Sequence, residues 1–294
     1  MSKTVTLKSY AKINLALDIT NSLENGYHEI ATVFQSISLC DMVSVSLNNK
    51  GIINVCTDNP LIPSDKNNIA FKAAEKFFEY VKCCEIGADI KIWKGIPSQA
   101  GLGGGSSDAA AVLKALNILT AAGISDEQLC SIGALLGADV PFCINGGTAY
   151  AEGIGEKLTA LPPVSDYSHN FLCIAKGNSG ISTAEAYRQY DIKKDLIHPD
   201  IQSVCKSLEN KKLSDTFGKL GNIFEQLIDS DDVRFIKKSM LEKNALASLL
   251  TGSGSAVFGI FRGMKDAGKC VSFFKNQNFF SDICTFKNCG SELI

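Results

Sequence analysis

The feature that most constrains this chain is the stretch PSQAGLGGGSSDAAAVL, residues 97–113, in which four glycines and a serine pair precede an apolar run. Glycine loses more backbone freedom on folding than any other residue, so such a cluster implies that something approaches the backbone closely. Residues 88–93 before it alternate like a strand, and residues 108–119 after it are apolar nearly all round, like a buried helix. The stretch therefore connects a strand to the start of a helix.

A glycine-rich start of a helix suits the binding of phosphate. The first turn of a helix has unpaired N–H groups and carries the positive end of the helix dipole, and both attract anions. The glycines would let a polyphosphate lie directly on the backbone, and Ser106 and Ser107 would add hydroxyl donors. The alternative is a tight connection between the strand and the helix, in which the glycines are needed only for packing. The two serines and the apolar helix favour phosphate binding.

Neither standard phosphate-loop motif fits the stretch. A Walker A motif counted from Gly101 would require a lysine after its sixth residue, which is Ser106, and none is present. A dinucleotide fingerprint that starts at Gly101 and Gly103 would require its third glycine where Ser106 stands. Because the dinucleotide fingerprint fails at Ser106, a dehydrogenase is the least favoured interpretation of the sequence.

Composition and charge narrow the class of protein. The 294 residues are 45% hydrophobic, which is ordinary for a globular protein and allows one large domain or two of moderate size. The formal net charge of −2 gives no indication of a nucleic-acid partner or an anionic membrane. Eleven cysteines include no C-x-x-C pair, so a zinc site or redox pair is not expected. With no membrane-length apolar run and no visible transit peptide, we expect a reducing cytoplasm and cysteines that act mostly as small buried hydrophobes.

Strands and helices alternate without strict strand–helix–strand repetition, which favours an α+β fold over a doubly wound parallel sheet. Residues 12–19 alternate between an apolar face and a face that carries Lys12 and Asn14, which predicts a half-buried strand. Residues 162–170 are the best candidate for a domain boundary. The other predicted elements are strands at 43–47, 88–93, 171–176 and 255–261, a hairpin at 144–161, and helices at 67–84, 108–119, 125–137 and 182–190.

Local signals predict where several helices begin and end. Asn67 or Asn68 is expected to cap the first helix, and Ser182 or Thr183 a later one. Ser125 and Gln128 have the spacing of a capping box, and Gly137 is a natural C-terminal stop.

Asp139 and Lys12 are the candidate groups for proton and charge chemistry. Pro141 restricts the preceding Val140 to extended geometry, so Asp139 is expected on a short stiff segment, where a carboxylate can accept a proton from a hydroxyl. Lys12 shares a strand face with Asn14 and could stabilise phosphate charge or an ionising hydroxyl. The alternatives are a local turn or capping bond for Asp139 and a solvated edge position for Lys12.

Two further segments could contribute to a site. Tyr27 and His28 follow the turn Asn25-Gly26 and could hold a nucleobase or another flat ring by stacking and hydrogen bonds. Their spacing alone favours a simpler reading, a turn with a core-facing tyrosine and an incidental histidine. The second Gly/Ser loop, TGSGS at 251–255, is either a tight turn or a brace that lies against the first loop.

These motifs together resemble the GHMP kinases (galactokinase, homoserine, mevalonate and phosphomevalonate kinases). PSQAGLGGGSSDAA is similar to their phosphate-loop signature, and TGSGSAVFG resembles their C-terminal glycine motif. YAKINLALDI, NGYHEI and LGADVPFCINGGTAYAEGIGE resemble the branch of the family that phosphorylates a cytidine-diphosphate-linked polyol. The likeness runs from about residue 9 to about residue 261.

The resemblance implies a two-lobed α+β fold with the site in the cleft between the lobes. The N-terminal ATP-binding lobe, residues 1–162, would be like ribosomal protein S5 domain 2, and the C-terminal substrate-binding lobe, residues 163–294, would be ferredoxin-like. Asp139 would be the general base that takes the proton of a tertiary hydroxyl, and Lys12 would stabilise the ionised oxygen and the transferring phosphoryl group. Mg²⁺ would bridge the phosphates of ATP. The residues that would hold ATP are Pro97, Gly101, Leu102, Gly103, Gly104, Gly105, Ser106 and Ser107.

On the acceptor side, the resemblance implies that Tyr27 stacks on the cytosine and that His28 hydrogen-bonds to the base edge. Tyr187 is the candidate for the second face of the sandwich, and Asn14 would orient Lys12 or touch a substrate phosphate. The metal ligands stay unassigned, with Ser107 as a guess, and the protein is expected to be a monomer or homodimer. The alternatives are another small-molecule kinase of this family, of homoserine or mevalonate type, and a non-catalytic nucleotide-binding member.

Overall fold

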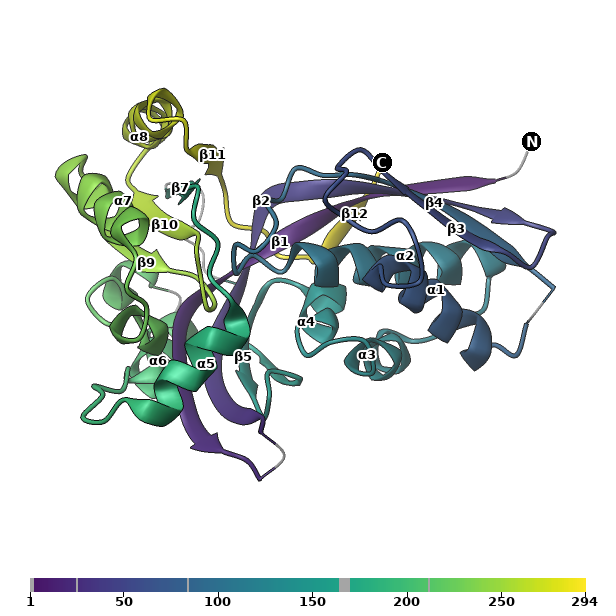
Figure 1. Cartoon of the computed structure of the whole chain (residues 1–294), viewed down its shortest axis with the longest axis horizontal. Coiled ribbons are helices and arrows are strands. Elements are labelled where there is room, and N and C mark those ends of the chain that lie inside the picture. Colours follow the sequence, from purple (N-terminus) through teal and green to yellow (C-terminus); the bar gives the residue numbers. More distant parts are fainter. Residues whose placement is uncertain (1–2, 25, 84, 164–169, 211) are drawn as a thin grey trace.

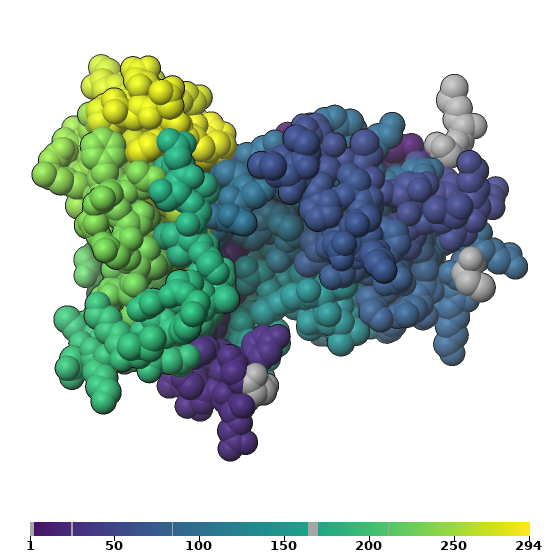
Figure 2. All heavy atoms as spheres, viewed as in Figure 1, coloured from purple at the N-terminus to yellow at the C-terminus, as the bar shows by residue number. Residues whose placement is uncertain are grey.

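The computed structural model describes residues 3–24, 26–83, 85–163, 170–210 and 212–294. The chain forms two lobes that stand side by side (Figure 1). In the space-filling view, the green and yellow atoms of the C-terminal half form one mass beside the blue and teal atoms of the N-terminal half (Figure 2). Both lobes contain helices and a sheet, so the predicted α+β class is confirmed.

Two long strands run through both lobes. β1 (Thr4–Ser22) pairs antiparallel with β2 (His28–Asn48), and the pairing is interrupted by irregularities such as the one between Tyr10 and Lys12. One part of this hairpin lies in the sheet of the larger lobe, and its tip reaches under the smaller lobe, where α5 (Thr183–Ile192) lies against it (Figure 1). The hairpin thereby connects the two lobes.

The predicted strand at 12–19 is confirmed as part of β1, but the prediction that it is half-buried is wrong, because both faces of β1 are buried from Ser9 to Ile19. On one face, Ile13 and Leu15 pack in an apolar cluster with Leu172 of the smaller lobe. On the other, the side chain of Lys12 lies against Gly103 of the glycine-rich stretch, where a Cβ would meet its Cγ at 3.0 Å. The polar face of this strand is therefore a wall of an internal site.

The larger lobe consists of a sheet with helices on one face (Figure 1). Its main strand order is β12-β1-β2-β4-β3, and the predicted hairpin at 144–161 is confirmed as the antiparallel pair β5–β6 beside β2. Asn68 caps α1, as expected, and Ser125 and Gln128 form the predicted capping box of α3. The remaining elements of this lobe are β3 (Ile53–Thr57), α1 (Ile69–Tyr80), β4 (Gly87–Trp93), α2 (Gly104–Thr120), α3 (Asp126–Ala134), α4 (Val140–Asn145), β5 (Thr148–Glu152), β6 (Lys157–Ala160) and β12 (Ser291–Leu293).

Three predicted local features differ in the structure. α2 begins at Gly104, so part of the glycine stretch is itself the first helical turn. α3 ends at Ala134, before Gly137. Val140 begins α4 instead of being extended, because Pro141 in the first turn gives up no helical hydrogen bond and the N–H of Val140 closes a turn on the carbonyl of Gly137 (3.1 Å).

The smaller lobe has an antiparallel sheet of order β11-β7-β10-β9. α7 and α8 cover one face, and the other face packs against β1, β2 and α6. Ser182 caps α5, as predicted. The elements are β7 (Phe171–Lys176), α5, α6 (Ile201–Glu209), the 3₁₀ helices η2 (Leu213–Thr216) and η3 (Ile223–Gln226), β8 (Gly221–Asn222), α7 (Asp231–Glu242), β9 (Ala247–Leu250), β10 (Val257–Phe261), α8 (Met264–Asn276) and β11 (Phe280–Cys284).

The chain crosses between the lobes more than once. β12, close to the C-terminus, pairs with β1 of the larger sheet, and β8 also pairs with β1. The boundary stretch 162–170 lies mostly outside the described residues. The division into 1–162 and 163–294 therefore stays a prediction. Among the described residues, no helix combines the length and the apolar character that crossing a membrane requires.

Candidate active site

Within the described part of the chain, three neighbouring cavities share lining residues: the central and outer cavities lie between the lobes, and the loop cavity is lined by the larger lobe. The loop cavity, about 370 Å³, is lined by Pro97, Leu102 and the glycines of the glycine-rich stretch. The central cavity, about 330 Å³, is lined by residues that include Lys12 and Asp139. The outer cavity, about 650 Å³, is lined by Tyr27, His28 and Tyr187 among others. Gly101 and Gly103 line both the loop and the central cavity, and Tyr187 lines both the central and the outer cavity.

Gly101 is held by the second Gly/Ser loop. Its φ is +72°, which favours glycine, and a Cβ at this position would lie 2.1 Å from the carbonyl oxygen of Thr251. The N–H of Ala256 also donates to the carbonyl of Ala100 (3.1 Å). The second loop therefore lies against the first and braces it, which settles the alternatives left open by the sequence.

The helical part of the stretch offers main-chain and hydroxyl groups at the start of α2. Gly103, with φ of +71°, precedes the helix, and a Cβ there would meet Cγ of Lys12 at 3.0 Å. Gly105 is exposed, and Ser106 lines the central cavity. The hydroxyl of Ser107 points elsewhere, because it is buried and donates to the carbonyl of Gly104 (3.0 Å). The free N–H groups at this end of the helix can therefore meet an anion together with Ser106.

Lys12 and Asp139 face each other in the central cavity. Nζ of Lys12 lies 3.6 Å from Oδ2 of Asp139, and the side chains are 5% and 32% exposed, so the lysine is buried while the carboxylate stays accessible. Asp139 is the N-cap of α4 but makes no side-chain capping bond, so the alternative of a local capping role does not hold. The lysine ammonium also lies 5.1 Å from the ring centre of Phe34. The pair places an acidic and a basic group where one reacting oxygen in the cavity could contact both.

Asn14 orients the lysine and connects it to the second loop. Its Oδ1 accepts hydrogen bonds from Nζ of Lys12 (2.8 Å) and from the backbone N–H of Gly252 (3.0 Å). Its Nδ2 donates to Oγ1 of Thr32 (2.8 Å), which fixes the amide orientation. Residues more than 230 positions apart in sequence are thereby joined behind the lysine.

The outer cavity brings the predicted aromatic residues together. The rings of His28 and Tyr187 stack with centroids 4.8 Å apart, and His28 is buried whereas Tyr27 is 60% exposed. Burial, and to a smaller extent the negative charge of Asp139, raise the pKa of Tyr187 to about 12. Tyr187 is therefore a neutral ring that lies between the central carboxylate and the outer cavity.

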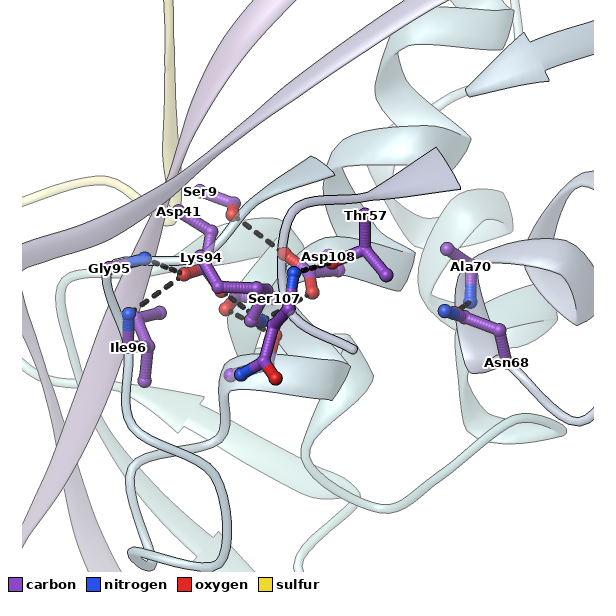
Figure 3. Close-up of polar contacts among 12 residues, drawn as sticks. Ser9, Asp41, Thr57, Asn68, Ala70, Lys94, Gly95, Ile96, Ser107 and Asp108 are labelled. Carbon is purple, nitrogen blue, oxygen red and sulfur yellow. Dashed lines mark hydrogen bonds and ion pairs between the residues drawn. The ribbon is translucent and has the colours of Figure 1, made fainter. Parts of the chain in front are cut away.

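Sequence reasoning missed a buried charge cluster beside the loop cavity (Figure 3). Nζ of Lys94 donates to Oδ2 of Asp108 (2.6 Å) and to Oδ2 of Asp41. The backbone N–H groups of Gly95 and Ile96 donate to Oδ1 of Asp41 at 2.7 and 2.8 Å. Burial and the nearby charge of Asp41 raise the pKa of Asp108 to about 8, because one ammonium cannot balance two buried carboxylates. No sequence signal marks this cluster, since its members come from three separate segments.

Comparison with known proteins agrees with this architecture. Residues 68–147 match the family model of the GHMP kinases N terminal domain. The whole fold is similar to that of homoserine kinase from Cytophaga hutchinsonii, with a TM-score of 0.78 at 19% identity over 100% of this chain and 98% of that one. The fold and the site together define a GHMP kinase.

Closer relatives identify the branch. The chain is 41% identical over 273 residues to the 4-diphosphocytidyl-2-C-methyl-D-erythritol kinase of Clostridium tetani, covering 92% of this chain and 96% of the relative. It is 39% identical to that of Clostridium novyi, covering 92% and 95%. A crystal structure of 4-(cytidine 5'-diphospho)-2C-methyl-D-erythritol kinase superposes with a TM-score of 0.77 at 30% identity, covering 96% of this chain and 98% of that one. The chain belongs to the 4-diphosphocytidyl-2-C-methyl-D-erythritol kinase family.

Proposed function

We propose that this protein transfers the γ-phosphoryl group of ATP to the C2 hydroxyl of 4-diphosphocytidyl-2-C-methyl-D-erythritol, giving the 2-phosphate and ADP. The reaction belongs to the non-mevalonate route to isoprenoid precursors. The observation that carries the proposal is the Lys12–Asp139 pair at 3.6 Å, in a cavity that shares walls with a glycine-lined cavity on one side and an aromatic-lined cavity on the other. Phosphoryl transfer depends mainly on positioning and charge neutralisation, and such an arrangement supplies both.

ATP would lie in the loop cavity with its phosphates on the start of α2. The bare amides at Gly104 and Gly105 and the hydroxyl of Ser106 would donate to phosphate oxygens, aided by the helix dipole. Gly101 and Gly103, which line both cavities, would lie where the triphosphate passes from one cavity into the other. Pro97 and Leu102 would form an apolar wall of the loop cavity.

Asp139 would act as the general base. Its carboxylate is partly exposed to the central cavity and free of a capping bond, so it can accept the proton of an incoming hydroxyl. The ammonium of Lys12, held by Asn14, would stabilise the oxygen as it ionises and the phosphoryl group as it transfers. Because Lys12 is buried and already held in place, it would need little reorganisation to stabilise these charges.

The donor set fits a nucleotide-borne Mg²⁺. This ion prefers oxygen ligands, usually keeps several waters, and needs only one or two protein oxygens besides substrate phosphates. Ser106 and Asp139, which both carry side-chain oxygen atoms, line the central cavity, whereas the hydroxyl of Ser107 is engaged with backbone carbonyls. We therefore propose Ser106, in place of Ser107, as the protein group that would hold the ion. When bound, the ion would neutralise part of the phosphate charge.

The outer cavity would hold the cytidine part of the acceptor. Tyr27 and Tyr187 offer aromatic faces, and His28 offers ring nitrogens for a base edge. Because the central and outer cavities share Tyr187 and Ala138, an acceptor bound by its base could present its hydroxyl to Asp139. The oligomeric state, monomer or homodimer, stays a prediction.

The proposal is tested with two variants and two matched controls. Asp139→Asn and Lys12→Ala should each lower kcat by about 100-fold or more, as expected for losing one group that stabilises transition-state charge or moves a proton. Asp126→Asn and Lys91→Ala, which change an exposed carboxylate on α3 and an exposed strand lysine on β4, should leave kcat unchanged. A folded variant at 12 or 139 within a few-fold of wild type would remove that residue from its role.

The acceptor hydroxyl is tested separately. The wild-type protein with ATP and 4-diphosphocytidyl-2-C-methyl-D-erythritol should release ADP and form a phosphomonoester on the tertiary carbon, detected by phosphorus NMR. The analogue that lacks the C2 hydroxyl should give no ADP above the background rate. ADP release that is the same with both compounds would mean hydrolysis of ATP and would contradict the proposed transfer.

A further inference from the structure

The imidazole of His28 is held by a carboxylate from the other lobe. His28 begins β2 in the long hairpin, and Asp191 lies near the end of α5, 163 positions later. Nε2 of His28 and Oδ1 of Asp191 are 2.8 Å apart, with side chains 6% and 49% exposed. Both residues line the outer cavity. A buried ring with a partner across the lobes is therefore part of the wall that an acceptor would contact.

The orientation of this ring is fixed on more than one side. Tyr187 stacks on it at a centroid distance of 4.8 Å, and Tyr190 meets it edge-on at 5.7 Å. The charged and titratable groups packed on the ring are Asp191, Tyr187 and Tyr190, all from α5. With the ring plane set by the two tyrosines, the carboxylate determines which ring nitrogen carries the proton.

The tautomer decides what the ring offers to a ligand. A neutral imidazole has one N–H donor and one acceptor nitrogen. A carboxylate accepts hydrogen bonds only, so Asp191 requires the proton on Nε2. Nδ1 is then left as an acceptor. An acceptor nitrogen suits an exocyclic amino group and repels the lone pairs of a carbonyl oxygen at the same place.

We infer that Asp191 is a positioning residue for base selection: it holds the proton of His28 on Nε2, so that Nδ1 accepts a hydrogen bond from the 4-amino group of cytosine and disfavours the 4-keto group of uracil. The inference rests on the proposed function, because it assumes a cytidine-bearing acceptor in the outer cavity. The inference gives a role to Asp191 in addition to the residues proposed to contact the base. Asp191 would act on the base only through His28.

A second carboxylate–imidazole pair provides a matched control. Asp18 on β1 accepts from Nδ1 of His198, which follows α5, at 2.8 Å. This pair also ties the segment around α5 to the hairpin, but neither of its members lines the outer cavity. If Asp191 served only to clamp α5 onto the hairpin, breaking either pair would have the same effect.

The test compares the cytidine acceptor with its uridine counterpart, at saturating ATP and pH 8, for the wild-type protein, Asp191→Asn and Asp18→Asn. An amide at 191 can accept from Nε2 or donate to it, so both tautomers of His28 become accessible. The substitution is isosteric and half-exposed, so the fold should persist. We expect the ratio of kcat/KM for cytidine over uridine to fall at least tenfold in Asp191→Asn. The change should lie in KM for the acceptor, with KM for ATP and kcat within threefold of wild type.

The outcomes separate the two claims. Asp18→Asn should keep the wild-type base selectivity, whatever it does to thermal stability. An unchanged ratio in folded Asp191→Asn, or an equal fall in both variants, would overturn the tautomer role and leave the kinase proposal standing. A wild-type protein that turns over neither acceptor would overturn the proposed function, and the role of Asp191 with it.

Discussion

We expect the glycines of the glycine-rich stretch to be present for two different physical reasons, and Gly105→Ala separates them. Gly105 is the second residue of α2, is exposed, and has an ordinary helical φ. A Cβ there would meet only the Cγ2 atom of Ile69, at 3.4 Å. Nothing in the folded chain therefore requires glycine at this position. We expect the requirement to come from the ligand, because a methyl group would cover the amide that meets a phosphate.

The magnitudes follow from this geometry. Replacing glycine by alanine in a helix should raise the free energy of unfolding by about 0.5 kcal/mol, toward the low end of the usual range because the site is in the first turn. Blocking the phosphate should raise KM for ATP about tenfold or more, equivalent to about 1.4 kcal/mol of binding. The variant is therefore expected to be slightly more stable and clearly worse at binding ATP.

Gly101→Ala is the matched contrast in the same loop. At φ of +72° and with a Cβ 2.1 Å from the carbonyl oxygen of Thr251, alanine would force the two Gly/Ser loops apart. We expect a loss of more than about 2 kcal/mol in the free energy of unfolding, from left-handed strain plus the clash.

Urea unfolding followed by circular dichroism gives the free energies, and steady-state ADP release with varied ATP gives KM. The reasoning is refuted if Gly105→Ala keeps KM for ATP within threefold of wild type, because the amide at 105 would then not meet a phosphate. It is also refuted if Gly105→Ala and Gly101→Ala are destabilised equally, because packing would then require both glycines.

The buried cluster beside the loop cavity gives two predictions. Burial and the charge of Asp41 raise the folded-state pKa of Asp108 from its ordinary value of 3.8 to about 8, so the stabilisation from its proton is full below pH 4 and is lost as the pH rises through 8. Between pH 5 and 9, wild type should therefore lose about 4 kcal/mol in free energy of unfolding relative to Asp108→Asn, which cannot titrate, and parallel urea-unfolding curves across that range would contradict this. Lys94→Met leaves the carboxylate of Asp41 buried with no ammonium beside it, since Asp108 is mostly protonated at pH 7, and should lower the free energy of unfolding by about 3–5 kcal/mol, measured in urea at that pH; a loss under about 1 kcal/mol would mean that Lys94 does not balance a buried charge.

Features set by neighbouring residues could be predicted from the sequence. The capping box of Ser125 and Gln128, the caps at Asn68 and Ser182, and the hairpin at 144–161 all depend on side chains a few positions apart. The connection of the glycine-rich stretch to a buried helix could also be predicted, whereas its role in binding phosphate stays a prediction. Local chemistry determines these features almost independently of the rest of the chain.

Features set by tertiary packing could not be predicted. The alternation at 12–19 indicates one polar face, but it cannot tell that a second lobe and the glycine stretch bury both faces. The proline rule predicted extended geometry at Val140, whereas a turn bond to Gly137 and the tolerance of a first helical turn for proline outweigh it. The cluster joins Asp41 within β2, Lys94 directly after β4 and Asp108 in α2, and no spacing in the sequence predicts that these residues meet.

The central site depends on a junction that neither lobe provides alone. Lys12 belongs to the larger sheet, but the amide of Asn14 that holds it is itself held by Gly252, which lies between β9 and β10 of the smaller lobe. The neighbouring Thr251 receives the N–H of Asn14 (3.0 Å) and packs on Gly101 of the phosphate loop. A shift of the smaller lobe would therefore move the glycine-rich stretch and the side chain of Lys12 together. Because one loop contacts both the glycine-rich stretch and the amide that holds Lys12, the same contacts fix the relative positions of these two groups.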